Sequence, residues 1–129
     1  ITCLSVIEHG VDLKLFFDEM FRILKPRGVL FISTDYWSTP IDTKGIAEYG
    51  TPVRVFTRTD ILEALELSKL SGLTPTGDVD LMCHEKAVRW VSDRYPHEYT
   101  FLVFTMTKPA STLPISDHQT TGLSAMADI

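Results

Sequence analysis

The segment "DLKLFFDEMFRILKP", residues 12 to 26, constrains the fold of this chain more than any other. Apolar residues stand at 13, 16, 17, 20, 21 and 24, the spacing of one face of an α-helix. Asp12 is a suitable N-cap, and Pro26 ends the helix because it disfavours the helical conformation at Lys25. The segment therefore predicts an amphipathic helix over 12–25 that must bury one apolar face.

Apolar, β-branched segments lie on both sides of this helix. "ITCLSVIE" precedes it and "GVLFIST" follows it. A continuous apolar strand is typical of a sheet covered on both faces, as parallel sheets are. The intervening helix is long enough for the crossover that parallel strands require. We therefore expect strands over 1–8 and 28–34, paired in parallel.

A second helix is expected further along the chain. The segment 35–56 has no clear period and is rich in Pro, Gly and aromatic residues, which indicates a long loop. After it, Thr57 and Asp60 have capping-box spacing, and Gly72 stands where a helix C-terminus often has glycine. These signals predict a helix over 58–71.

The last part of the chain predicts two further strands. "YTFLVFTM" is a strong strand signal over 99–107, and "DVDLMC" is a weaker one near 77–83. The residues from 108 to 129 are rich in Ser, Thr and Pro and are expected to form a polar tail. The predicted fold class is α/β, with about four strands and helices packed on them in one domain over 1–107.

Composition excludes several classes of function. The net charge is −5 and no cluster of Lys and Arg occurs, which argues against binding to nucleic acid. No apolar run is long enough to cross a membrane, and no signal peptide is recognisable. Cys3 and Cys83 have no metal-site spacing and are expected to be reduced, as in a cytoplasmic protein. No metal site is predicted, since the adjacent side chains of "CHEK", residues 83–86, rarely converge on one ion.

Three segments together resemble the C-terminal half of a class I S-adenosylmethionine-dependent methyltransferase. These are "SVIEHG", "DLKLFFDEMFRILKPRG" and "VLFISTDYW". In that family a strand ends in a Glu-His pair, and a helix ending in R-x-L-K-P-G-G leads to a buried strand. The matching residues here are Glu8, His9, Arg22, Leu24, Lys25, Pro26 and Gly28. The resemblance extends over roughly residues 1–107.

The resemblance implies a fold and a cofactor. It implies a partial Rossmann-like sheet whose last strand is inserted antiparallel, and S-adenosylmethionine as the methyl donor. Ser5 and Val6 would lie beside the methionine part of that cofactor. The acceptor would be a small molecule, or a lipid- or sugar-linked group. Methyl transfer is an in-line displacement, so the protein must align donor and acceptor and place a base nearby.

Two departures from the family pattern stand out. Arg27 occupies the position of the first glycine after Lys-Pro, at a cost of about 1 kcal/mol if that turn needs a positive φ. In the family, the glycine-rich loop and the acidic residue that binds the ribose precede the strand equivalent to 1–8. No G-x-G occurs in these 129 residues. We therefore expect a fragment whose N-terminal cofactor-binding half is missing, with little S-adenosylmethionine affinity and no activity alone.

The candidate site residues follow the first two predicted strands, because the carboxyl ends of parallel strands open onto the ligand crevice. Glu8 and His9 are the candidate catalytic residues, and Tyr36 and Trp37 the candidate acceptor-binding residues. Each has a structural alternative. Glu8 could cap a turn, His9 could hydrogen-bond to backbone, and the two aromatic residues could pack over the sheet. For Asp35, capping of the loop is favoured over binding a polar acceptor.

Two rival functions are a non-enzymatic α/β interaction module and another Rossmann-like, nucleotide-using enzyme. A further expectation concerns association. Without a neighbour, the strand over 1–8 would leave backbone groups unpaired, and no Pro or Lys protects that edge. We expect the chain to self-associate through this strand, and the first helix to expose part of its apolar face near Phe17 and Phe21.

Overall fold

The computed structural model describes residues 1–91 and 96–110, which form a mixed α/β fold with two helices and a mixed sheet. The elements in chain order are β1 (Thr2–Leu4), α1 (Leu13–Ile23), β2 (Val29–Tyr36), β3 (Ala47–Glu48), β4 (Thr51–Pro52), α2 (Arg58–Leu70), β5 (Thr74–Pro75), β6 (Val88–Val91) and β7 (Pro96–Thr107). Of the predicted tail, residues 111–129 lie outside the described part of the chain.

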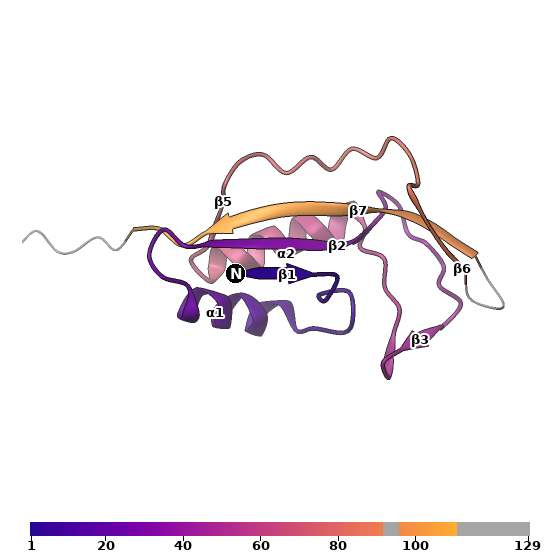
Figure 1. The fold of residues 1–129 in the computed structure, drawn as a ribbon, viewed down its shortest axis with the longest axis horizontal. Coiled ribbons are helices and arrows are strands. Elements are labelled where there is room, and N and C mark those ends of the chain that lie inside the picture. The colour runs from indigo at the N-terminus through magenta and orange to yellow at the C-terminus, as the bar shows by residue number, and fades with distance from the viewer. Residues whose placement is uncertain (92–95, 111–129) are drawn as a thin grey trace, which may run out of the picture.

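The main sheet has the strand order β1-β2-β7-β5, and β6 pairs with the first part of β7 (Figure 1). β1 and β2 are parallel, with Cys3 opposite Ile32. β7 is antiparallel to β2 along the whole of β2, from Val29 opposite Thr107 to Tyr36 opposite Thr100. The parallel first pair is therefore as the sequence predicted, and the last strand is antiparallel, as the family resemblance implied.

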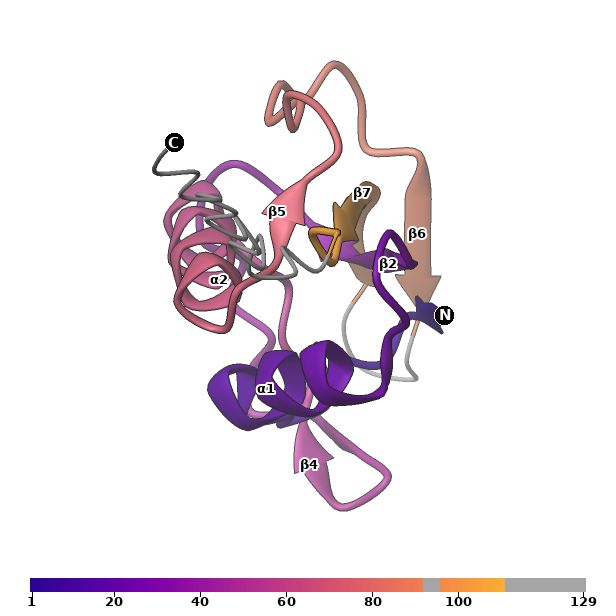
Figure 2. The same ribbon diagram turned by 90° about the vertical axis from the view of Figure 1, so that its left-hand side faces the viewer.

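Both helices lie on the same side of this sheet (Figure 2). The side chains that alternate toward them on β2 are buried, whereas those on the opposite face are half-buried or, at Val29, exposed. Phe17 of α1 and Ile61 of α2 are fully buried in this core, beside Leu30 and Ile32 of β2. The described residues thus cover β2 with helices on one face, not on two as its continuous apolar sequence predicted. The prediction that α1 would expose its apolar face near Phe17 and Phe21 was wrong for Phe17, because α2 and the sheet enclose this side chain, whereas Phe21 is only partly buried.

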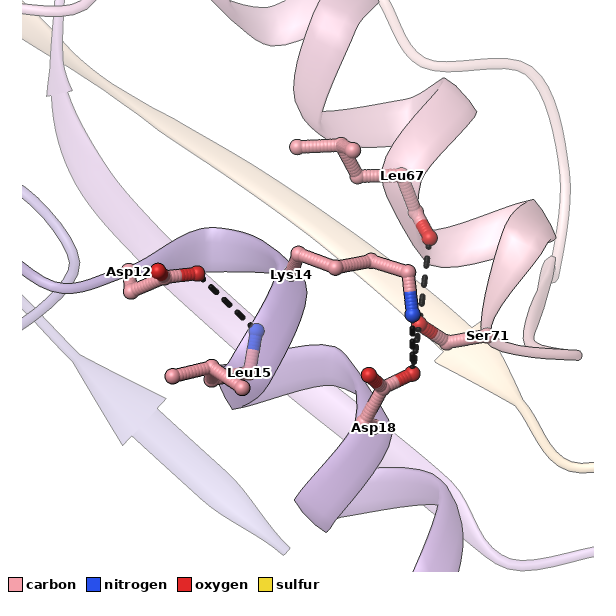
Figure 3. Close-up of polar contacts among 6 residues, drawn as sticks. All are labelled: Asp12, Lys14, Leu15, Asp18, Leu67 and Ser71. Atoms are coloured by element: carbon pink, nitrogen blue, oxygen red, sulfur yellow. Dashed lines mark hydrogen bonds and ion pairs between the residues drawn. The ribbon is translucent and has the colours of Figure 1, made fainter.

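Caps define both helices as the sequence predicted. Asp12 accepts a hydrogen bond from the backbone N–H of Leu15 at 3.0 Å, and Thr57 and Asp60 form a reciprocal capping box on α2. Figure 3 shows that Ser71, at the end of α2, donates to Asp18 in the middle of α1 at 2.7 Å. This bond links the two helices.

The turn between α1 and β2 contains the unusual Arg27. Its φ is +63°, so the turn does place a non-glycine residue in the left-handed region. Lys108 stabilises this corner, because its ammonium group donates to the carbonyls of Phe21 and Leu24 at 2.7 and 3.0 Å. Its ammonium also lies 4.3 Å from the centre of the Phe21 ring. Lys108, predicted to begin the tail, is therefore bound to the folded domain.

Two predicted strands differ from the structure. β1 ends at Leu4, not at residue 8, because Ser5 has a φ of +50° and turns the chain out of the strand. The segment near 77–83 is a loop, in which the Asp80 carboxylate accepts the backbone N–H of Met82 at 2.9 Å. Such a local bond competes with strand pairing. The neighbour of β7 on that side is instead β5.

Two short pairings were not predicted from the sequence. The residues between the strands expected near 77–83 and over 99–107 include β6, which pairs antiparallel with β7. Within the predicted loop over 35–56, β3 and β4 form a small two-stranded sheet. No helix in the described part of the chain is both long and apolar enough to cross a membrane.

Candidate functional site

A pocket of about 380 Å³ opens beyond the carboxyl ends of β1 and β2. Four parts of the chain form its walls: the turn after β1, the end of β2, the β3–β4 region and the first half of β7. The lining residues are Ser5, Glu8, His9, Asp35, Glu48, Tyr49, Val53, Val55, His97, Tyr99 and Phe101. Its volume lies within the range of small-molecule sites in proteins.

The turn after β1 brings three of the predicted site residues, Ser5, Glu8 and His9, to this pocket. The Ser5 N–H donates to the Ser33 carbonyl at 3.0 Å, which holds the end of β1 against β2. The chain then turns, and the N–H of His9 donates to the Val6 carbonyl at 3.0 Å. Ile7 enters the core with 2% of its surface exposed, and it anchors the turn. Glu8 is drawn inward with it.

Glu8 is a buried carboxylate with 2% of its surface exposed. One oxygen, Oε2, accepts a hydrogen bond from Thr34 Oγ1 at 3.3 Å. The other, Oε1, is buried and has no hydrogen-bond donor among the described residues. A buried charged group without its full set of hydrogen bonds costs several kcal/mol. Such a group needs an explanation, and ligand binding is one.

Asp35 and Tyr99 form a second polar pair in the pocket. The Tyr99 hydroxyl donates to the Asp35 carboxylate. Burial, followed by the nearby negative charge of Glu8, raises the pKa of Asp35 to about 6. Burial and the Asp35 carboxylate raise the pKa of Tyr99 to about 12. Asp35 therefore exchanges its proton close to neutral pH, the range in which a general base is effective.

His9 lines the pocket and is half-buried, with its ring edge-on to Tyr49 and 5.7 Å between the ring centres. Its Nδ1 atom is buried and makes no hydrogen bond within the described residues. Gly10, which follows, has a φ of +75°, and an added Cβ would come within 3.2 Å of the Thr51 side chain. This close approach brings the turn after β1 against the β3–β4 hairpin.

No family model and no curated protein matches this chain. The site is therefore interpreted from its own geometry. In the described part of the chain, no three His, Cys, Asp or Glu side chains are arranged to hold a metal ion.

The structure brings together three of the six residues that the sequence singled out, because Ser5, Glu8 and His9 all line the pocket. Val6, a predicted cofactor contact, does not line it, and 45% of its surface is exposed. The turn after β1 explains this difference, because its residues point in different directions instead of alternating as in a strand.

Tyr36 and Trp37, the predicted acceptor-binding residues, do not line this pocket. Tyr36 is on the helix-covered face of β2 with 1% of its surface exposed, and its hydroxyl donates to the Leu81 carbonyl at 2.9 Å. Trp37 packs under Lys86, whose ammonium lies 5.0 Å from the centre of the ring. The geometry gives both residues contacts with the loop that precedes β6, and so agrees with the packing alternative.

Sequence reasoning missed Glu48, Tyr49, His97 and Tyr99, and it favoured a loop-capping role for Asp35. Nothing local marks the first three residues, since two lie in the segment interpreted as a loop and His97 precedes the strand expected over 99–107. Tyr99 had a usable signal. In the β7 segment "YTFLVFTM", alternation places Tyr99 on one face of the strand and the buried Leu102 and Phe104 on the other. Tyr99 could therefore be expected to lie on the uncovered side of the sheet.

Proposed function

We propose that this chain supplies the acceptor-binding side of an S-adenosylmethionine-dependent methyltransferase. The observation that carries the proposal is the pocket at the carboxyl ends of the parallel strands β1 and β2, with Glu8, His9 and Asp35 in its wall. Open α/β sheets bind ligands at that end of their strands. The antiparallel insertion of β7 between β2 and β5 supports the same proposal, because the family resemblance implies it.

The described residues alone do not fit the cofactor. No G-x-G turn is available to approach the methionine or ribose groups. The Ser5 N–H is already bonded to Ser33, and Val6 lies outside the pocket. We therefore assign no bond from this chain to S-adenosylmethionine and derive no step through it. The chain's own contribution is to hold the acceptor and to handle its proton.

Proton transfer is the chemistry that the pocket residues support best. The Asp35 carboxylate has a pKa of about 6 and interacts with the Tyr99 hydroxyl, and it is mostly ionised at pH 7.5. Such a group can accept a proton from an amine or hydroxyl acceptor. The buried Glu8 Oε1 can accept a hydrogen bond from the same acceptor and hold it in the pocket. His9, which also lines the pocket, is a further candidate base.

The test is transfer of a radiolabelled methyl group from S-adenosylmethionine to small amine and hydroxyl acceptors. It should be run with this chain and with the whole reading frame of its gene. We expect no turnover by these 129 residues alone and turnover by the whole reading frame. Glu8→Gln or Asp35→Asn should lower that turnover at least tenfold, and Glu63→Gln, which changes an exposed carboxylate on α2, should leave it unchanged. Absence of methyl transfer by the whole reading frame would reject the proposed function.

A second proposal concerns association of the chain with a second copy. β1 is at the edge of the sheet, and no described strand pairs with its outer side. The hydrogen bonds from Phe31 to Ile1 and from Ser5 to Ser33 point toward β2. By alternation, the backbone groups of Thr2 and Leu4 face outward and can pair with the same strand of another copy. This feature also fits a non-enzymatic interaction module.

The location that we propose with this function is the cytoplasm. Cys3 and Cys83 are both free thiols, the state expected in a reducing compartment. Cys3 is buried in the core beside the pocket, and burial raises the pKa of its thiol. It is therefore a packing residue and not a nucleophile.

A further inference from the structure

The charge of the pocket is the first observation that bears on its ligand. Three carboxylates, Glu8, Asp35 and Glu48, are among the lining residues, and none of the lining residues is Lys or Arg. Glu8 and Glu48 both act on Asp35 electrostatically, which indicates that the three charges face a common volume. Negative charges gathered in a half-enclosed pocket favour a positively charged ligand.

The second observation is the buried Glu8 oxygen. Glu8 lines the pocket, and its Oε1 is buried without a hydrogen-bond donor among the described residues, while Oε2 accepts a hydrogen bond from Thr34. A ligand that carries an N–H or O–H group would complete the hydrogen bonds of this carboxylate. The carboxylate is fixed in place by its burial, so the donor would be bound in one position.

The size and the other walls of the pocket limit the kind of cation. A single metal ion would occupy a small part of about 380 Å³, and the described residues offer no group of ligands that could hold one. The walls contain the aromatic rings of Tyr49, Tyr99 and Phe101, two of which are in edge contact, with 6.1 Å between ring centres. Aromatic faces attract organic cations and bury apolar groups.

From these observations we infer that the pocket binds an organic ammonium ligand, with an N–H group donating to Glu8 Oε1 and an apolar body against the aromatic wall. If the bound ligand is also the methyl acceptor, that acceptor is an amine-bearing small molecule, and this part of the inference rests on the proposed function. As a statement about what the pocket binds, it does not depend on methyl transfer.

Calorimetry with two probes of equal shape tests the inference, without any cofactor. The probes are 2-phenylethylamine, which is a cation at pH 7.5, and the uncharged 2-phenylethanol. We expect the amine to bind at least ten times more tightly than the alcohol. Glu8→Gln should remove this difference and leave alcohol binding within about twofold. The control, Glu63→Gln, changes an exposed carboxylate outside the pocket and should leave both affinities unchanged.

A second variant covers the case in which Glu8→Gln does not fold. Glu48 is half-buried in the small hairpin, so Glu48→Gln should fold and should weaken amine binding at least threefold. Amine and alcohol bound equally, or not bound at all, would overturn the inference, and so would amine binding unchanged by both variants.

The pH dependence gives an independent check. Amine binding should tighten severalfold from pH 5 to pH 7.5 as Asp35 ionises. The other titratable groups that line the pocket with Asp35 are Glu8, His9, Glu48, His97 and Tyr99. Failure of this inference can be distinguished from failure of the proposed function. Methyl transfer to hydroxyl acceptors alone would reject the amine as the methyl acceptor, whereas amine binding without any methyl transfer would reject only the proposed function.

Discussion

Replacing Asp35 by Asn should stabilise the protein at neutral pH, although Asp35 lies in the candidate site. The folded state raises the pKa of this carboxyl from 3.8 to about 6, chiefly through burial and then through the charge of Glu8. The folded protein therefore holds the proton more tightly than the unfolded chain between these pH values. The free energy of unfolding therefore falls as the pH rises from 3.8 to about 6, and the full destabilisation by the Asp35 charge is present above pH 6. Asparagine carries no charge, so it avoids this cost and can still accept the hydrogen bond from Tyr99.

The magnitude follows from the same pKa. A tenfold change in a protonation equilibrium is worth about 1.4 kcal/mol, so a rise from 3.8 to about 6 corresponds to about 3 kcal/mol. Asp35 is half-buried, and solvent screening reduces the part that appears as stability. We expect Asp35→Asn to gain about 1–2 kcal/mol at pH 7.5 and less than half as much at pH 4.5.

Urea unfolding at the two pH values measures this difference. The variant should raise the midpoint at pH 7.5 without changing the slope, since the surface exposed on unfolding is the same. Asp78→Asn, in an exposed loop outside the pocket, is the matched control and should have no such pH-dependent effect. A loss of stability that is equal at both pH values would refute the reasoning, because it would mean that the Asp35 charge is stabilised and not strained.

Four further predictions test other parts of the structure. Arg27→Gly should raise the free energy of unfolding by up to about 1 kcal/mol, measured in urea, because Arg27 has a φ of +63°. Gly72→Ala should lower it by about 1–3 kcal/mol, since the φ is +90° and the new Cβ would lie 2.8 Å from the Phe21 ring. Sedimentation at micromolar concentration should detect a dimer that Leu4→Lys converts to monomer. Leu70→Lys, which changes another exposed leucine, should leave the dimer intact, and a wild-type monomer would reject the β1 interface. Calorimetry with S-adenosylmethionine should give a dissociation constant no tighter than about millimolar for these 129 residues, and micromolar binding would contradict the missing contacts.

The sequence alone was sufficient for the elements whose signals are local. The apolar stripe of α1 and the Asp12 cap lie within a few residues of each other, and so do Thr57 and Asp60 of α2. Steric preference and side-chain spacing determine such features, and tertiary contacts rarely reverse them when all the signals agree. The strand–helix–strand order with parallel pairing follows from the same patterns, because a helix between two strands leaves enough chain for a crossover.

Part of the candidate site also followed from the sequence. Glu8 and His9 could be placed at the end of a strand, and the end of a parallel strand is where a ligand crevice forms. Their surroundings could not be read in the same way. Thr34, which binds Glu8, is 26 residues away, and Tyr99 is 64 residues from Asp35.

Tertiary structure decided the rest, because the pocket depends on contacts between segments that no local pattern connects. The end of β1 at Leu4 results from the left-handed Ser5, and the burial of Glu8 results from the anchoring of Ile7 in the core. The raised pKa of Asp35 exists only because β2, β7 and the turn after β1 enclose the carboxyl and bring a second charge beside it. Desolvation and charge repulsion are properties of a folded volume. The sequence therefore determined which acidic residues the chain carries, and the fold determined which of them share a pocket.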